Sequence, residues 1–311
     1  MTAIPVIGRI GRRTRPRGPS ARAVLTAAGD SARLPERAVV LSSGLLVVSL
    51  LTAWVLAQLY LLGGLEYARH QDRLYADFRA ELAEGVAPTG GVIAPGSPVA
   101  LLRLPGLDVE QVVVEGTSAG HLVGAPGHRR DTVLPGQAGV SVLYGRSQTF
   151  GAPFAVMLDE AIGRPLQVVT AQGTSTYRVE RVRRADDSVP APPADGQGRL
   201  TLITSEGNGR LGALSPGHVV YVDASLQSEA FEGGGGRVNT ISTSERTMAS
   251  DTSVLPLLAL ALGALLVVLV ALLLAVRRFG RVLTWTVAVP IVGALLWFVG
   301  DLAVHLVPNL V

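Results

Sequence analysis

The sequence predicts an all-β domain, a barrel or a sandwich, carried between three transmembrane helices. Three long segments have no charged residue, and a run of short strand-like pieces lies between the first and the second of them. Of the 311 residues, 48% are hydrophobic and only 16% are charged. Soluble domains carry roughly 25% charged residues, so this composition argues against a soluble enzyme of this length.

Residue types that the chain lacks exclude several kinds of chemistry. It has no cysteine, which rules out thiolate catalysis, disulfides and cysteine-bound zinc or iron–sulfur clusters. All 27 basic residues are arginine, which rules out a lysine Schiff base and a phosphate-binding Walker lysine. We expect no cofactor.

The uncharged segments predict the membrane helices. Residues 38–62, 254–276 and 282–300 carry no charge, and about 20 apolar residues span a bilayer. We therefore expect transmembrane helices at 38–62, 254–276 and 282–307. The first is too long for a cleavable signal core and is predicted to be an uncleaved signal anchor.

The arginines predict the orientation of these helices. Residues 1–37 form a basic tail and residues 277–281 a basic turn, and basic segments remain cytoplasmic. The chain is then a multi-pass plasma-membrane protein with a cytoplasmic N-terminus and an extracytoplasmic β domain. The basic tail should attract anionic membrane lipid. It has no interleaved aromatic residues, so nucleic-acid binding is not expected.

The part between the first two membrane helices divides into three. Residues 63–97 should form a helix, with apolar residues at near-helical spacing, followed by a Gly/Pro-rich linker. Residues 98–226 contain the strands, and residues 227–253 form a Gly/Ser-rich tether that we expect to be flexible. The predicted strand pieces are PVALLRL, QVVVE, VSVLY, LQVVT, TYRVERV, RLTLIT and HVVYVD.

Three stretches inside the β region carry more than a strand pattern. Residues 112–154 end in VSVLYGRSQTFGAPF, residues 158–182 begin LDEAIGRPLQVV, and residues 200–206 read LTLITSE. In this order and spacing they resemble sortases, the cell-envelope transpeptidases of Gram-positive bacteria, and most of all the actinobacterial class E forms. The resemblance implies a closed eight-stranded β-barrel over residues 98–226.

The same resemblance implies three active-site positions, and this sequence departs from the family at each. Arg146 takes the position of the family's His, in the run Tyr144-Gly145-Arg146-Ser147. Ser205 takes the position of the nucleophilic Cys at the end of the TLxTC-type strand. His218 falls on or beside the position of the family's Arg. We therefore expect no catalytic residue and a sortase-like protein that has lost transpeptidase chemistry.

The expected function is then binding. The chain would be a scaffold or substrate-holding module for a cell-envelope protein or peptide, including a secreted partner. The binding-groove candidates are Arg146, Ser205, His218, Tyr144 and Thr204. The alternative is a serine-dependent hydrolase or acyltransferase on the same barrel, in which His218 would take the proton of Ser205.

A buried Arg146 requires an acceptor, because an unpaired buried charge is costly. One possibility is a carboxylate or a main-chain carbonyl of a bound peptide. The other is an internal ion pair, for instance with Glu206. The sequence leaves both open.

Other polar residues have ordinary explanations that we favour. His121 and His128 lie in a Gly-rich stretch and lack a third metal ligand of known geometry, so a polar surface loop is expected and no metal site. The Asp186-Asp187 pair is typical of a turn. Asp301 and His305 share one helix face near the interface, where helix-end polarity is favoured over an intramembrane functional pair.

Overall fold

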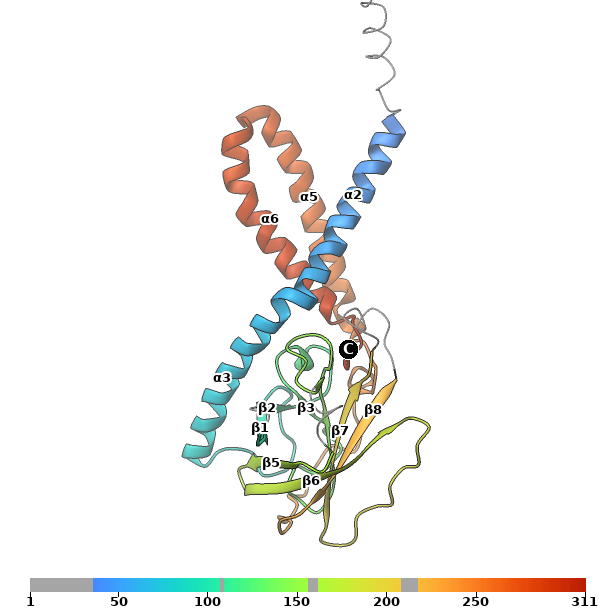
Figure 1. Ribbon diagram of the computed structural model, residues 1–311. Helices are drawn as coiled ribbons and strands as arrows, with labels where there is room; N and C mark the ends of the chain where they lie inside the picture. The colour runs from blue at the N-terminus through green and yellow to red at the C-terminus, as the bar shows by residue number, and fades with distance from the viewer. Residues whose placement is uncertain (1–35, 107–108, 156–161, 208–217) are drawn as a thin grey trace, which may run out of the picture. The chain divides into compact units, whose positions relative to one another are not determined.

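The computed structural model describes residues 36–106, 109–155, 162–207 and 218–311, and Figure 1 shows its helices and strands. Most of the predicted basic tail lies outside these residues. The helices are α2 (Glu36–Ala57), the π-helical turn η1 (Gln58–Leu62), α3 (Gly63–Glu84), α5 (Leu255–Phe279) and α6 (Arg281–Val304).

Three helical spans among the described residues are long and apolar enough to cross a membrane. They are Val48–Glu84, Thr252–Phe279 and Val282–Val304. This agrees with the three predicted helices and indicates membrane association. The first span contains α3, the helix expected after the first membrane segment, whose buried residues include Tyr67 and Phe78. It ends where Gly85 adopts a left-handed conformation at φ 69°.

The β domain is a closed barrel, as the resemblance implied. Its strand order is β1-β2-β3-β4-β7-β8-β6-β5. The strands are β1 (Pro98–Leu104), β2 (Val109–Glu115), β3 (Gly127–His128), β4 (Gly139–Tyr144), β5 (Pro165–Thr170), β6 (Gly173–Arg184), β7 (Gly198–Ser205) and β8 (Val219–Leu226). Seven of them overlap the predicted pieces. β3 has only two residues and therefore no periodicity to detect, yet it connects β2 to β4.

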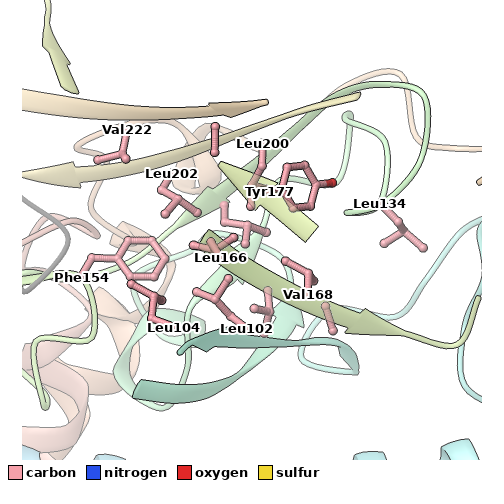
Figure 2. Close-up of a cluster of buried hydrophobic side chains, with 14 of the residues drawn as sticks. Leu102, Leu104, Leu134, Phe154, Leu166, Val168, Tyr177, Leu200, Leu202 and Val222 are labelled. Carbon is pink, nitrogen blue, oxygen red and sulfur yellow. The ribbon is translucent and has the colours of Figure 1, made fainter. Parts of the chain in front are cut away.

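Apolar side chains from the strands fill the barrel interior, as Figure 2 shows for fourteen of them. Every second residue of a strand points inward. On β7 these are Leu200 and Leu202, and on β8 they are Val222 and Ala224. Phe154, from the loop after β4, is fully buried among them.

The outer face of β4, β7 and β8 is also buried, which is unusual for an antiparallel-rich sheet that could face water. A second apolar cluster covers it, with Tyr144 and Ile203 supplied by the strands. Leu122, from the 3-10 turn η2 (His121–Val123), and Leu310, near the last described residue, complete the cluster. Figure 1 marks the C-terminal end of the chain beside the barrel.

The expected flexible tether packs on the barrel along both of its halves. In the first half, the N–H of Phe231 donates to the carbonyl of Gly136 (2.8 Å). Thr117 donates a hydrogen bond from its hydroxyl to the main-chain oxygen of Glu245 (2.7 Å), and the hydroxyls of Tyr144 and Thr247 lie 2.6 Å apart. A capping box between Ser242 and Glu245 orders the short helical turn η4 (Thr243–Glu245). These polar contacts join residues far apart in sequence, so composition alone did not indicate them.

Candidate functional site

Strand pairing brings Arg146 and Ser205 together. β4 and β7 run parallel, and Tyr144 is in register with Ile203. The pairing continues past Tyr144, since Gly145 N–H donates to the carbonyl of Ile203 (3.0 Å). Ser147 then donates its hydroxyl proton to the main-chain oxygen of Ser205. The positions that the sequence aligned with the family's His and Cys are therefore neighbours.

Arg146 is completely buried, and both of its terminal Nη groups donate to main-chain or hydroxyl oxygens, whereas its Nε has no hydrogen-bond partner among the described residues. Nη1 donates to the main-chain oxygen of Val311 (2.7 Å) and to the hydroxyl of Thr149 (3.2 Å). Nη2 donates to the carbonyl of Ala119 (3.1 Å). The guanidinium also lies over the ring of Phe150, 5.1 Å from its centre. Such a planar fork suits two main-chain acceptors at once.

The electrostatics of this burial limit the chemistry of Arg146. Loss of solvent lowers the pKa of its guanidinium to about 9. The group therefore remains protonated at neutral pH and cannot take a proton from Ser205. It can only donate hydrogen bonds.

The suggested ion pair between Arg146 and Glu206 is wrong. Glu206 pairs instead with Arg184, at 2.9 Å between Oε2 and Nε, on the surface. That arginine lowers the pKa of the Glu206 carboxyl group through their hydrogen bond. The acceptors that the structure provides are main-chain oxygens of the chain itself, which neither alternative from the sequence had named.

Ser205 is buried, and its hydroxyl donates to the carbonyl of Leu310 (2.7 Å). His218 is exposed, and the β7–β8 pairing sets Val219, not His218, opposite Ser205. The carbonyl of His218 accepts a hydrogen bond from the backbone N–H of Glu206 (2.8 Å). Within the described chain, no hydrogen bond joins the Ser205 hydroxyl to the His218 ring.

The other two groove candidates divide between the two faces of the barrel wall. Tyr144 is on the outer face with Ile203, and burial raises the pKa of its phenol. Thr204 has the parity of Leu200 and Leu202, whose side chains belong to the interior core. It is buried, and alternation along β7 directs it away from Ser205.

No sequence pattern indicated the segment that contacts this site. Asn309, Leu310 and Val311, which we call the tail, are each at most 1% exposed. The Asn309 side chain donates to the carbonyls of Thr117 (2.8 Å) and Arg246 (2.9 Å), and its backbone N–H donates to the carbonyl of Ala249 (3.0 Å). The only feature of the tail that stands out in the sequence is one polar residue, Asn309, in a short apolar run after α6. Nothing in that run pointed to the barrel.

We call the residues that receive the tail the tail site. Its polar contacts to the tail come from Thr117, Arg146, Thr149 and Ser205, and its apolar members are Leu122, Val142, Tyr144 and Ile203. The carbonyl of Ala119 holds Arg146 in place. Beside the tail site, an open cavity of about 350 Å³ is lined by Tyr144 and by Arg129, Asp131 and Arg246 among others.

Backbone strain is concentrated around the tail site. Among the described residues, the non-glycine positions with positive φ are Phe150 (49°), Ala152 (46°) and Met248 (59°). Phe150 and Ala152 follow Arg146 in the loop after β4, and Met248 packs against the cluster that contains Leu310. Such conformations cost about 1–3 kcal/mol each and tend to gather at functional sites.

The remaining candidates have structural explanations. His128 is buried on β3, not in a surface loop: its Nδ1 lies 2.7 Å from Oε2 of Glu115, and strand pairing carries it into the barrel wall. Asp187 accepts a hydrogen bond from the N–H of Arg184 in a turn (2.7 Å). Asp301 and His305 line a cavity of about 150 Å³ together with Glu66 and His70. No cluster suited to a metal ion occurs among the described residues.

The comparison with protein families agrees with the resemblance seen in the sequence. Residues 102–211 match the sortase domain family. Among solved structures, a Clostridium perfringens sortase D5 transpeptidase is 18% identical, with a TM-score of 0.42 over 51% of this chain and 99% of that one. Sortase E from Streptomyces avermitilis is 23% identical, with a TM-score of 0.35 over 44% of this chain and 91% of that one. No curated relative matches the chain.

Proposed function

We propose that this chain, whose residues 102–211 match the sortase domain family, binds an extended peptide without catalysing transpeptidation. One observation carries the proposal. At the site where the family resemblance sets its nucleophile and its histidine, Ser205 and Arg146 both donate hydrogen bonds to main-chain oxygens. The two side chains are arranged to hold a peptide backbone.

The absence of transpeptidase chemistry follows from the side chains available. A serine hydroxyl is a weak nucleophile unless a neighbouring base takes its proton. Arg146 stays protonated at neutral pH, and His218 is exposed at the strand edge. A serine hydrolase using Ser205 and His218 would first need these two residues to change position, so we favour binding.

The location that we propose follows the arginine pattern of the membrane segments. The turn at residues 277–281 is cytoplasmic, and so is the N-terminus, which sets the barrel on the extracytoplasmic side. The partner is then a protein or peptide of the cell envelope, and an actinobacterial envelope suits the class E resemblance. A cysteine introduced at Gly235, an exposed position with open space around it, should react with an impermeant maleimide on intact cells.

The experiment separates binding from catalysis in the full-length protein in detergent. A fluorophosphonate probe should leave Ser205 unlabelled, with Ser205→Ala as the background. Labelling that Ser205→Ala abolishes would establish the serine-hydrolase alternative and overturn the proposal.

Binding is measured by titrating end-blocked peptides with a branched aliphatic residue that follows a small polar amide residue. Because Leu310 fills the apolar part of the site, the chain carries Leu310→Asp in this titration. Adding Arg146→Ala should weaken binding by about 1.5–3 kcal/mol, which is roughly tenfold or more. Arg184→Ala, which removes an exposed arginine paired with Glu206, is the matched control and should leave the affinity unchanged.

A further inference from the structure

We infer that the tail is an internal ligand of the tail site, so that an external peptide binds only by displacing Asn309–Val311. The inference rests on the proposed function and adds its regulation and its ligand class. The ligand is a peptide with a branched aliphatic residue that follows a small polar amide residue.

The contacts of the tail are those of a bound peptide. Two successive main-chain oxygens are held by side chains of the barrel: that of Leu310 by Ser205 (2.7 Å) and that of Val311 by Arg146 (2.7 Å) and Thr149 (2.5 Å). These donors come from the end of β7 and from the loop after β4. Main-chain contacts of this kind select a peptide without selecting its sequence.

Side-chain contacts supply the selectivity. Leu310 is fully buried in the cluster that contains Leu122, Tyr144 and Ile203. Burial of a leucine side chain in such a cluster is favourable because it removes apolar surface from water. The Asn309 amide donates to two carbonyls, which an aliphatic side chain could not do. The position before the leucine therefore favours an amide donor.

An empty tail site would be unfavourable. The tail can therefore be replaced by another peptide, but it cannot simply leave the site unfilled. Without the tail, Arg146 would keep only Ala119 and Thr149 as partners within the described contacts. An arginine with unsatisfied donors in a buried position is costly. The replacement must therefore also bring main-chain oxygens, which a lipid chain or an apolar small molecule does not supply.

Tethering gives the tail an advantage over a free peptide. The tail follows α6 after a short connection, since α6 ends at Val304. A segment linked this closely competes at an effective concentration in the millimolar range. Intact protein should therefore bind free peptide weakly, and release of the tail should raise the affinity strongly.

The test uses the full-length chain in detergent and a fluorescent peptide with the sequence of residues 306–311. Leu310→Asp in the protein puts a charge in the apolar cluster, and we expect it to raise the affinity for the probe by about 100-fold or more. Val189→Asp, at an exposed position, is the control for the added charge and should match the unmodified chain. A probe that carries the same Leu-to-Asp change should not bind.

A second measurement reports the tail directly. The chain has no cysteine, so Val311→Cys is the sole thiol, and it should react slowly with maleimide while the tail is bound. Gly235→Cys gives the rate of an accessible thiol. Saturating probe, or Leu310→Asp, should raise the rate at position 311 toward that reference.

The outcomes distinguish the two proposals. Equal probe affinity in the unmodified and the Leu310→Asp chains means that the tail does not block the site, which overturns the inference but leaves peptide binding intact. A fast thiol at position 311 in the Leu310→Asp chain with no probe binding means that an open site holds no such peptide, and then the proposed function fails as well. A slow thiol in that variant also overturns the inference.

Discussion

The two faces of the sheet formed by β4, β7 and β8 are buried in different ways. The inner face is covered by apolar side chains of the barrel's own strands, such as Leu143, Leu200 and Val222. The outer face is covered by Leu122, Met248 and Leu310, from segments before, after and far beyond the strands in sequence. The inner face specifies the fold, whereas the outer face depends on contacts that can be exchanged.

The polar groups follow the same division. The interior cluster consists of apolar residues and Tyr177, whose hydroxyl accepts a hydrogen bond from the N–H of Gly136 (2.6 Å). On the outer side, Arg146, Ser205 and Asn309 are buried, and each makes a hydrogen bond between the barrel and the tail. Side chains that are buried among the barrel's own strands form a permanent core. Buried side chains whose hydrogen-bond partners can be replaced are suited to a ligand site.

The largest effect is expected from the inner face. Phe154→Ala should lower the free energy of unfolding by about 3–5 kcal/mol, because it leaves a cavity in the centre of the core. Thermal unfolding of the full chain in detergent, followed by near-ultraviolet circular dichroism, measures it. Val189→Ala, at a site 78% exposed, is the control. A loss below about 1 kcal/mol would show that the core is not the main source of stability.

A smaller effect on the free energy of unfolding is expected from the ion pair between Asp223 and Arg183 on the outer side of the barrel. Asp223 accepts hydrogen bonds from Arg183 (2.7 Å) and from the hydroxyl of Thr201 (2.8 Å), and it is buried. Asp223→Ala should cost about 3 kcal/mol, because it leaves a charge without its partner. The maleimide rate of the Val311→Cys thiol in the tail should not change. If that rate rose, the ion pair and the tail would form a single coupled unit.

Ser205→Cys should have a still smaller effect on stability and none on chemistry. It removes one hydrogen bond to Leu310, worth about 1 kcal/mol. Transpeptidation of a sorting-signal peptide should remain absent, because Arg146 still stands where the family has its histidine. Product analysis by mass spectrometry checks this. Cleavage by the single variant would show that the other two family positions are wrongly aligned.

The smallest effect concerns pH. Burial lowers the pKa of His121, which faces Glu245, His305, Arg130 and Asp251. Between the lowered folded value and the ordinary value near 6.5, the unfolded chain binds more protons, so stability rises with pH through this window and is lost below it. The melting temperature should fall between pH 7 and pH 5 more in the unmodified chain than in His121→Gln. Equal slopes would contradict the assignment.

Sequence patterns predicted the inner face far better than the outer one. Strand pieces such as PVALLRL have a local apolar pattern, and β1 has the predicted bounds, Pro98–Leu104. The membrane helices follow from length and charge in the same way. The family resemblance also named Arg146 and Ser205, which the strand pairing makes neighbours. Each of these signals is read from a short local stretch of sequence.

The rest of the site depends on contacts between distant residues. Leu310 and Ser205 are separated by 105 positions, and Asn309 and Thr117 by 192. No local propensity encodes such a pairing. His128 was misplaced for the same reason, since its burial depends on Glu115 in another strand and on a two-residue strand without periodicity. Tertiary contact, not composition, decided both cases.

The short connection between α6 and the tail has a mechanical consequence. Only residues 305–308 separate the end of the helix from Asn309, and four residues reach about 13–14 Å at full extension. A helix that spans the bilayer shifts or tilts when the hydrocarbon thickness changes. Any such shift beyond the slack of this linker must draw Leu310 out of its pocket. The thickness of the surrounding bilayer would thereby affect whether the tail site is free to bind a peptide.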